Sequence, residues 1–157
     1  MARLTPRRDG RYARRVKRLE LVRIKQCSRC GRGGAELRSA DGDVVVVPLD
    51  PVRVRQLASD GKQEPELPTF TDVVLERFAA AGLVAREVVL DTIDGRLHAV
   101  LSLAAGAPDL VGCTAEEGVA VAVRGDLPLY ATDEAIAYAA RAREHAPRGA
   151  GGPGTLH

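Results

Sequence analysis

Alternating hydrophobic and polar positions recur along the chain, and this period of two predicts β-strands. The segment 18–25 alternates in this way, whereas 44–49 is a short apolar run typical of a buried strand. Turn residues such as Asp94-Gly95 separate neighbouring segments, as in β-hairpins. The predicted strands are 18–25, 35–39, 44–49, 84–90, 96–103, 110–112 and 127–131.

Helix-start signals between these strands predict four helices. Thr69 and Asp72 have the spacing of a capping box, in which two side chains bond reciprocally to two backbone amides. Thr114 and Glu117 repeat this spacing. The predicted helices are 51–59, 70–81, 115–123 and 133–145. This order of elements indicates an α+β fold, a mixed β-sheet with packed helices in a single domain.

The two flanks of the chain lack the apolar positions that a packed core needs. Residues 1–17 are rich in arginine, and residues 146–157 are rich in glycine and proline. Both compositions favour disorder. We therefore expect a basic disordered arm over 1–17, a folded domain over 18–145 and a disordered tail over 146–157.

Charge is distributed unevenly along the chain. The formal net charge is +2, yet residues 1–18 hold eight basic side chains and one acidic side chain, and the remainder holds 15 basic and 20 acidic ones. A cationic segment of this kind is suited to phosphate backbones; a solvated leader without a binding role is the alternative. The predicted nucleic-acid-binding residues are Arg7, Arg8, Arg11, Arg14, Arg15, Lys17 and Arg18.

Aromatic residues are scarce, with two phenylalanines, three tyrosines and no tryptophan. Phe70 and Phe78 fall on helical segments, and we expect them in the core. The folded domain then lacks a stacking platform for single strands. DNA or RNA is expected to bind through the arm, without recognition of bases.

Cysteine usage and hydropathy indicate the setting of the protein. Three cysteines are an odd number, which favours a reducing, cytoplasmic compartment over a secreted disulfide framework. No apolar run approaches the roughly 18 residues that cross a bilayer, so no membrane partner is predicted. A small mixed sheet has an edge strand that needs covering, which favours a homo-oligomer.

Cys27 and Cys30 have the spacing of a zinc knuckle, in which two thiolates on a tight turn supply half of a tetrahedral site. Only Cys113 with a histidine, or a second copy of the chain, remains to complete such a site. The alternative is a reduced or labile thiol pair. Cys113 is expected to be a small buried residue, or a reactive thiol at a helix start if it is exposed.

Residues 18–140 resemble the bifunctional nuclease domain family, which is associated with DNase and RNase activity. The likeness covers a glycine–strand–proline block, a helix start, a hairpin, and a small-residue helix followed by a strand. The segments that carry it are 42–49, 68–74, 88–99, 117–124 and 127–130. The sequence departs from the family at polar positions, because a family arginine and a family histidine are replaced by Thr114 and Thr71.

The resemblance implies that Asp72, Glu116 and Glu117 occupy polar positions of the family site. As catalytic residues they would hold Mg²⁺ or Mn²⁺ for phosphodiester hydrolysis, the chemistry that paired carboxylates support. The alternative assigns Asp72 and Glu117 to helix capping.

The sequence is compatible with three hypotheses about function. The first is a nucleic-acid-binding, nuclease-like protein that hydrolyses DNA or RNA. The second is a catalytically inactive binding or assembly module of the same fold. The third is a zinc- or redox-responsive regulator that uses Cys27 and Cys30.

Overall fold

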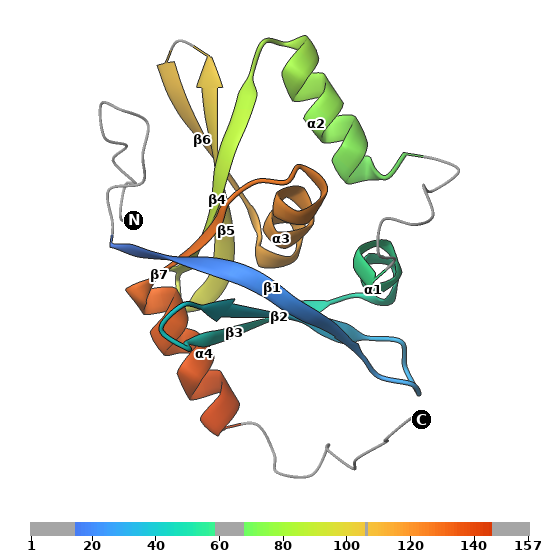
Figure 1. The fold of residues 1–157 in the computed structure, drawn as a ribbon, viewed down its shortest axis with the longest axis vertical. Coiled ribbons are helices and arrows are strands. Elements are labelled where there is room, and N and C mark those ends of the chain that lie inside the picture. Colours follow the sequence, from blue (N-terminus) through green and yellow to red (C-terminus); the bar gives the residue numbers. More distant parts are fainter. Residues whose placement is uncertain (1–14, 59–67, 106, 146–157) are drawn as a thin grey trace.

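A mixed β-sheet forms the centre of the molecule in the computed structural model, which describes residues 15–58, 68–105 and 107–145 (Figure 1). Within these ranges seven strands pair in the order β3-β2-β1-β7-β4-β5-β6. All pairs are antiparallel except β4 with β7. The strands are β1 (Val16–Gln26), β2 (Gly33–Ser39), β3 (Val44–Leu49), β4 (Val84–Ile93), β5 (Arg96–Ala105), β6 (Ala107–Thr114) and β7 (Leu129–Thr132).

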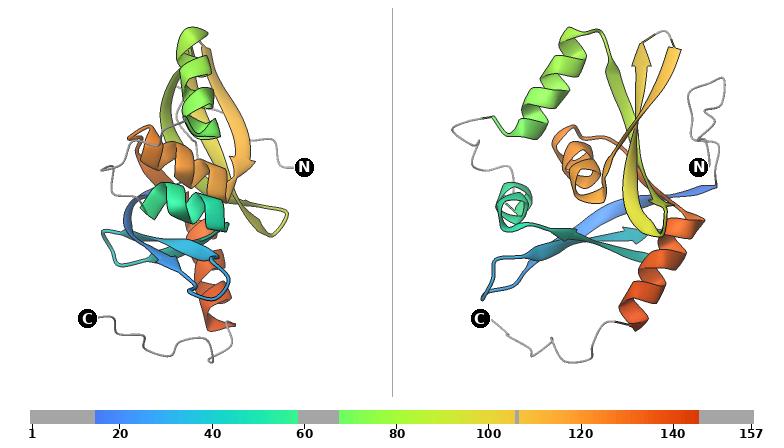
Figure 2. Two further views of the ribbon diagram at one scale, coloured as in Figure 1. Left: turned by 90° about the vertical axis from the view of Figure 1, so that its right-hand side faces the viewer. Right: turned by 180° about the vertical axis from the view of Figure 1, so that it is seen from behind.

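Four helices in the described ranges surround this sheet, three of them in one group and the fourth apart from it. They are α1 (Pro51–Ala58), α2 (Phe70–Ala80), α3 (Ala115–Arg124) and α4 (Asp133–Glu144). Helix α3 packs on β4 and β5 and also contacts α1 and α2, so these three helices form one group. Figure 2 shows α4 apart from that group, where it packs against β3, β4 and β7.

Helix α3 is the buried centre of the core, and its small residues allow it to approach the sheet closely. A Cβ atom at Gly118 would collide with the Cβ of Ala99 on β5 and would press on Val88 of β4. Val119 on the same helix is fully buried. The glycine is therefore required by packing, since its left-handed conformational freedom is not used at this position.

The observed elements confirm the predicted α+β class. Several element limits differ from the prediction, and β6 is much longer than the expected 110–112. β1 begins at Val16, so residues 16 and 17 belong to the sheet and not to the arm predicted over 1–17. Val16 and Lys17 pair with Thr132 and Ala131 of β7, which extends the strand toward the N-terminus. Residues 1–14 and 146–157, where the arm and tail are predicted, lie outside the described residues.

None of the helices in the described part of the chain combines the length and the apolar character that crossing a membrane requires.

Candidate functional site

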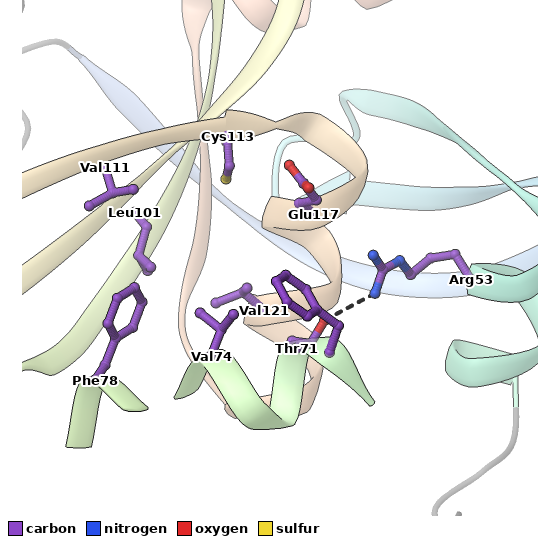
Figure 3. Close-up of a pocket in the computed structure, with 10 residues that line it drawn as sticks. Arg53, Thr71, Val74, Phe78, Leu101, Val111, Cys113, Glu117 and Val121 are labelled. Carbon is purple, nitrogen blue, oxygen red and sulfur yellow. Dashed lines mark hydrogen bonds between the residues drawn. The ribbon is translucent and has the colours of Figure 1, made fainter. Parts of the chain in front are cut away.

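A pocket of about 170 Å³ lies where α2, α3 and the paired strands β5 and β6 meet (Figure 3). Thr71, Val74 and Phe78 recur along α2 at the spacing that places side chains on one helix face, and all three line the pocket. Figure 3 shows the Cys113 thiol directed toward its interior. The lining residues are Arg53, Phe70, Thr71, Val74, Phe78, Leu101, Val111, Cys113, Glu117 and Val121.

Both helices that border the pocket begin with the predicted capping boxes. In α2 the backbone N–H of Asp72 donates to Thr69 Oγ1 at 3.2 Å, and the N–H of Thr69 donates to Asp72 Oδ2 at 2.8 Å. In α3 the same pair of bonds joins Thr114 and Glu117, at 3.2 and 3.0 Å. Two of the three predicted catalytic acids therefore satisfy amides at helix ends.

Asp72 has a second structural partner. The guanidinium of Arg124, in the last turn of α3, donates from Nε to Asp72 Oδ1 at 2.9 Å and from Nη2 to Oδ2 at 2.8 Å. These bonds, followed by those from Thr69, lower the pKa of Asp72 to about 2. Asp72 is thus ionised and is already bound on both oxygens.

Glu116, the third predicted catalytic acid, is bound elsewhere. Its Oε1 accepts a hydrogen bond of 2.9 Å from the backbone N–H of Asp50, at the start of α1, and lies 4.0 Å from Nε of Arg53. The bond ties the first turn of α3 to the chain that enters α1. Only Glu117 of the three acids lines the pocket.

Asp72, Glu116 and Glu117 do not form a cluster that could bind a cation. Across the described ranges, no group of three or more histidine, cysteine, aspartate or glutamate side chains is placed to hold a metal ion. A Mg²⁺ or Mn²⁺ site would need such converging oxygen ligands. Divalent-metal catalysis by these acids therefore stays a prediction that the described geometry does not favour.

The polar rim of the pocket includes Arg53, a residue that no feature of the sequence marks. Arg53 Nη1 donates to Thr71 Oγ1 at 3.0 Å and to Gln56 Oε1 at 3.3 Å, which links α1 to α2 (Figure 3). Thr71 is the residue that replaces the family histidine. The bond from Arg53 to Thr71 could not be read from the sequence, because the two residues are 18 positions apart.

Cys113 is half-buried and fits the expectation of an unactivated thiol, whereas Phe70 does not fit the expectation for it. Burial, with a smaller effect of the nearby Glu117 carboxylate, raises the pKa of Cys113 to about 11, so this thiol is not the activated group that a helix start would produce. Phe70 is 76% exposed, so the prediction that it packs in the core is wrong. Phe70 is the first residue of α2 and lines the pocket.

A second candidate surface lies on the face of β1 and β2 that points away from the core. The pairs Glu20↔Arg38 and Arg23↔Glu36 are in register, so these side chains project on one face. Arg18 lies two residues before Glu20, and Lys25 lies two residues after Arg23. Both belong to the same face, because a register shift between Leu21 and Arg23 changes the alternation along β1. We call Arg18, Arg23, Lys25 and Arg38 the cationic surface; all four are exposed.

A single buried acid organises this surface. The Glu36 side chain is only 6% exposed and lies 2.6 Å from Lys25 Nζ, 3.0 Å from Arg23 Nη2 and 3.4 Å from Arg38 Nη2. Lys25, followed by Arg23, lowers the pKa of Glu36 to about 2. One carboxylate therefore holds three cationic groups together and leaves the cluster with an excess of positive charge.

The predicted arm residues fall in different places relative to this surface. Arg18 belongs to it and lines a shallow depression with Arg38. Lys17 instead pairs with Asp43 at 2.8 Å and Asp41 at 3.0 Å, and these acids raise its pKa. Arg15 is exposed just before β1. Four predicted binding residues lie outside the described residues: Arg7, Arg8, Arg11 and Arg14.

Cys27 and Cys30 lie in the turn that joins β1 to β2, and both are exposed. Hydrogen bonds from the backbone N–H of Cys30, from its thiol and from the N–H of Arg29 lower the pKa of Cys27. No third histidine, cysteine, aspartate or glutamate of the described ranges joins them in a metal-binding group. Cys113 lines the distant pocket instead and does not complete a zinc site with this pair.

Comparison with known proteins gives no family assignment. The chain matches no protein-family model and no curated protein sequence.

Proposed function

We propose that the protein is a nucleic-acid-binding module of bifunctional-nuclease-like fold that contacts phosphates through the cationic surface and the arm preceding it. The observation that carries this proposal is the segregation of charge within the described domain. Residues 15–39 contain eight basic and two acidic side chains, whereas the other described residues contain eight basic and 15 acidic ones. An acidic body presenting one cationic hairpin orients itself toward a polyanion.

The geometry of β1 and β2 supports contact with a phosphate backbone. Antiparallel strands project the paired side chains Arg38 and Glu20, and then Arg23 and Glu36, in successive rows along one face. Because Glu36 is buried under its partners, the exposed charged groups on this face are four cationic side chains and the single carboxylate of Glu20. Each cation that replaces a condensed counterion adds salt-dependent affinity without reading the base sequence.

Binding without hydrolysis is the version that the contacts favour. Asp72 and Glu117 each cap a helix, and Glu116 holds the backbone amide of Asp50. Removing any of these acids from its partner would leave a helix terminus or a backbone amide unsatisfied. The reducing, cytoplasmic location inferred from cysteine usage belongs to the same proposal.

Fluorescence anisotropy with labelled DNA and RNA of equal length tests the proposal. We expect the double variant Arg18→Glu/Arg38→Glu to weaken binding at least about tenfold in dilute salt and to reduce the slope of log affinity against log salt by about 2. The matched control is Arg86→Glu/Arg96→Glu, which reverses two exposed arginines on β4 and β5. Equal loss in both double variants would contradict a specific role for the cationic surface.

The role of the arm is measured separately, by a deletion that ends at residue 14. The boundary matters because Val16 and Lys17 are part of β1, and a longer deletion would damage the sheet. We expect weaker binding with unchanged circular dichroism. Cleavage of DNA or RNA in Mg²⁺ or Mn²⁺ that is abolished by Glu116→Gln or Glu117→Gln would establish the hydrolytic alternative instead.

Self-association remains a separate prediction. β3 and β6 are the two edges of the sheet, and each carries an exposed valine, Val46 and Val111. Edge strands of this kind pair with other chains unless they are covered. Light scattering of the purified protein over a range of concentrations measures its oligomeric state.

A further inference from the structure

The turn that carries Cys27 and Cys30 is closed by its own backbone hydrogen bonds. The N–H of Cys27 donates to the carbonyl of Arg32 at 2.7 Å, and the N–H of Gly31 donates to the carbonyl of Cys27 at 2.9 Å. Gly31 has φ of +73°, a left-handed conformation that lets the chain reverse directly after the second cysteine. Figure 1 shows this turn as the light-blue loop at the lower right, where β1 connects to β2.

This geometry keeps the two sulfur atoms close together and open to solvent. The Cys27 sulfur is within hydrogen-bonding reach of the Cys30 thiol and of the backbone N–H groups of Arg29 and Cys30. Both cysteines are exposed, whereas Cys113 is half-buried in the pocket. A pair of neighbouring thiols on an exposed turn can form a disulfide with little backbone movement.

We propose that Cys27 and Cys30 form a reversible dithiol–disulfide site that reacts with low-molecular-weight disulfides. The pair acts without a metal, because no third protein ligand of the described ranges joins it. The proposal is independent of nucleic-acid binding, since it concerns only the chemistry of the turn.

The reaction is a two-step thiol–disulfide exchange. The Cys27 thiolate attacks one sulfur of a disulfide RSSR, forms Cys27–S–S–R and releases RS⁻. Cys30 then loses its proton to solvent and attacks the Cys27 sulfur, which forms the Cys27–Cys30 bond and releases a second RS⁻. Two protein thiols are thus oxidised by two electrons, RSSR is reduced, and the two released thiolates take up the two protons. Cys27 is the attacking group because the backbone N–H donors face its sulfur.

Trypsin digestion of the full chain gives a direct test, because Arg29 separates the two cysteines. Cleavage after Lys25, Arg29 and Arg32 places Cys27 and Cys30 on different peptides. After incubation with oxidised glutathione, we expect peptides 26–29 and 30–32 to remain joined and to separate on addition of reduced glutathione. In Cys30→Ser the reaction stops at the first step, and a glutathione adduct accumulates on Cys27.

The matched control is Cys113→Ser, which removes the remaining cysteine and should give the same yield of the joined peptides. Separate glutathione adducts on Cys27 and Cys30, without joined peptides, would overturn the proposal. So would reduced protein that binds about one Zn²⁺ per two chains and resists oxidation while it is bound, since the pair would then be half of a metal site shared between copies.

Discussion

The guanidinium of Arg124 donates hydrogen bonds to both carboxylate oxygens of Asp72. Arg124 is the last residue of α3, and Asp72 lies in the first turn of α2. The two residues are 52 positions apart in the sequence. Bidentate pairs of this kind are the most specific arginine–carboxylate contacts. The interaction makes Asp72 a link between two helices that border the pocket, and it accounts for this acid without a catalytic role.

Replacement of Asp72 should therefore reduce stability. We expect Asp72→Ala to lower the free energy of unfolding by about 1–2 kcal/mol, since it removes the acceptor for the Thr69 amide in the capping box and the partner of Arg124. Asp72→Asn should cost less, because the amide oxygen of asparagine can still accept the bond from the Thr69 N–H. Urea denaturation measures both. Glu76→Ala, an exposed change on the same helix, is the control, and equal destabilisation by Glu76→Ala would contradict the assignment.

The same pair predicts an acid dependence of stability. The pKa of Asp72 is about 2 in the folded protein, below its ordinary value of 3.8. The ionised group therefore stabilises the fold above about pH 4, and this contribution is lost as the pH falls through about 2. Arg124→Gln should be less stable than the natural protein at pH 6 and should approach it in strong acid. A difference that stays constant with pH would show that Arg124 acts through packing alone.

Gly118 should not tolerate a methyl group. We expect Gly118→Ala to destabilise the protein by about 1–3 kcal/mol, because its Cβ would occupy the space of the Ala99 side chain. Ala99→Gly should restore part of this loss in the double variant. Thermal unfolding monitored by circular dichroism measures both. Gly112→Ala is the control, since nothing lies within 4 Å of a Cβ at that position.

Cys113 should react slowly with alkylating reagents in the folded protein. Its pKa is raised to about 11 from 9.0, which reduces the thiolate fraction at neutral pH about a hundredfold. Peptide mass spectrometry after timed exposure to iodoacetamide should show Cys27 modified well before Cys113. In concentrated urea the two rates should become similar. Equal rates in the folded protein would mean that the pocket is open at Cys113.

Local features of the fold were predictable because their partners are close in sequence. Thr69 and Thr114 each bond to a residue three positions ahead, so the two helix starts can be read directly from the chain. Asp94 and Gly95 have φ of +51° and +71°, as the predicted hairpin turn between β4 and β5 requires. The limits of β1 were less predictable, since its first residues pair with β7, more than a hundred positions away.

The amino-acid sequence by itself determined the α+β class, the capping boxes and the uneven charge, because these depend on composition and on short-range spacing. The tertiary structure alone decided that Arg124 meets Asp72, that Arg53 meets Thr71, and that Glu36 gathers three cations on one sheet face. The reason is physical: partners distant along the chain are brought together by how the core packs. Spacing in the sequence does not carry that information.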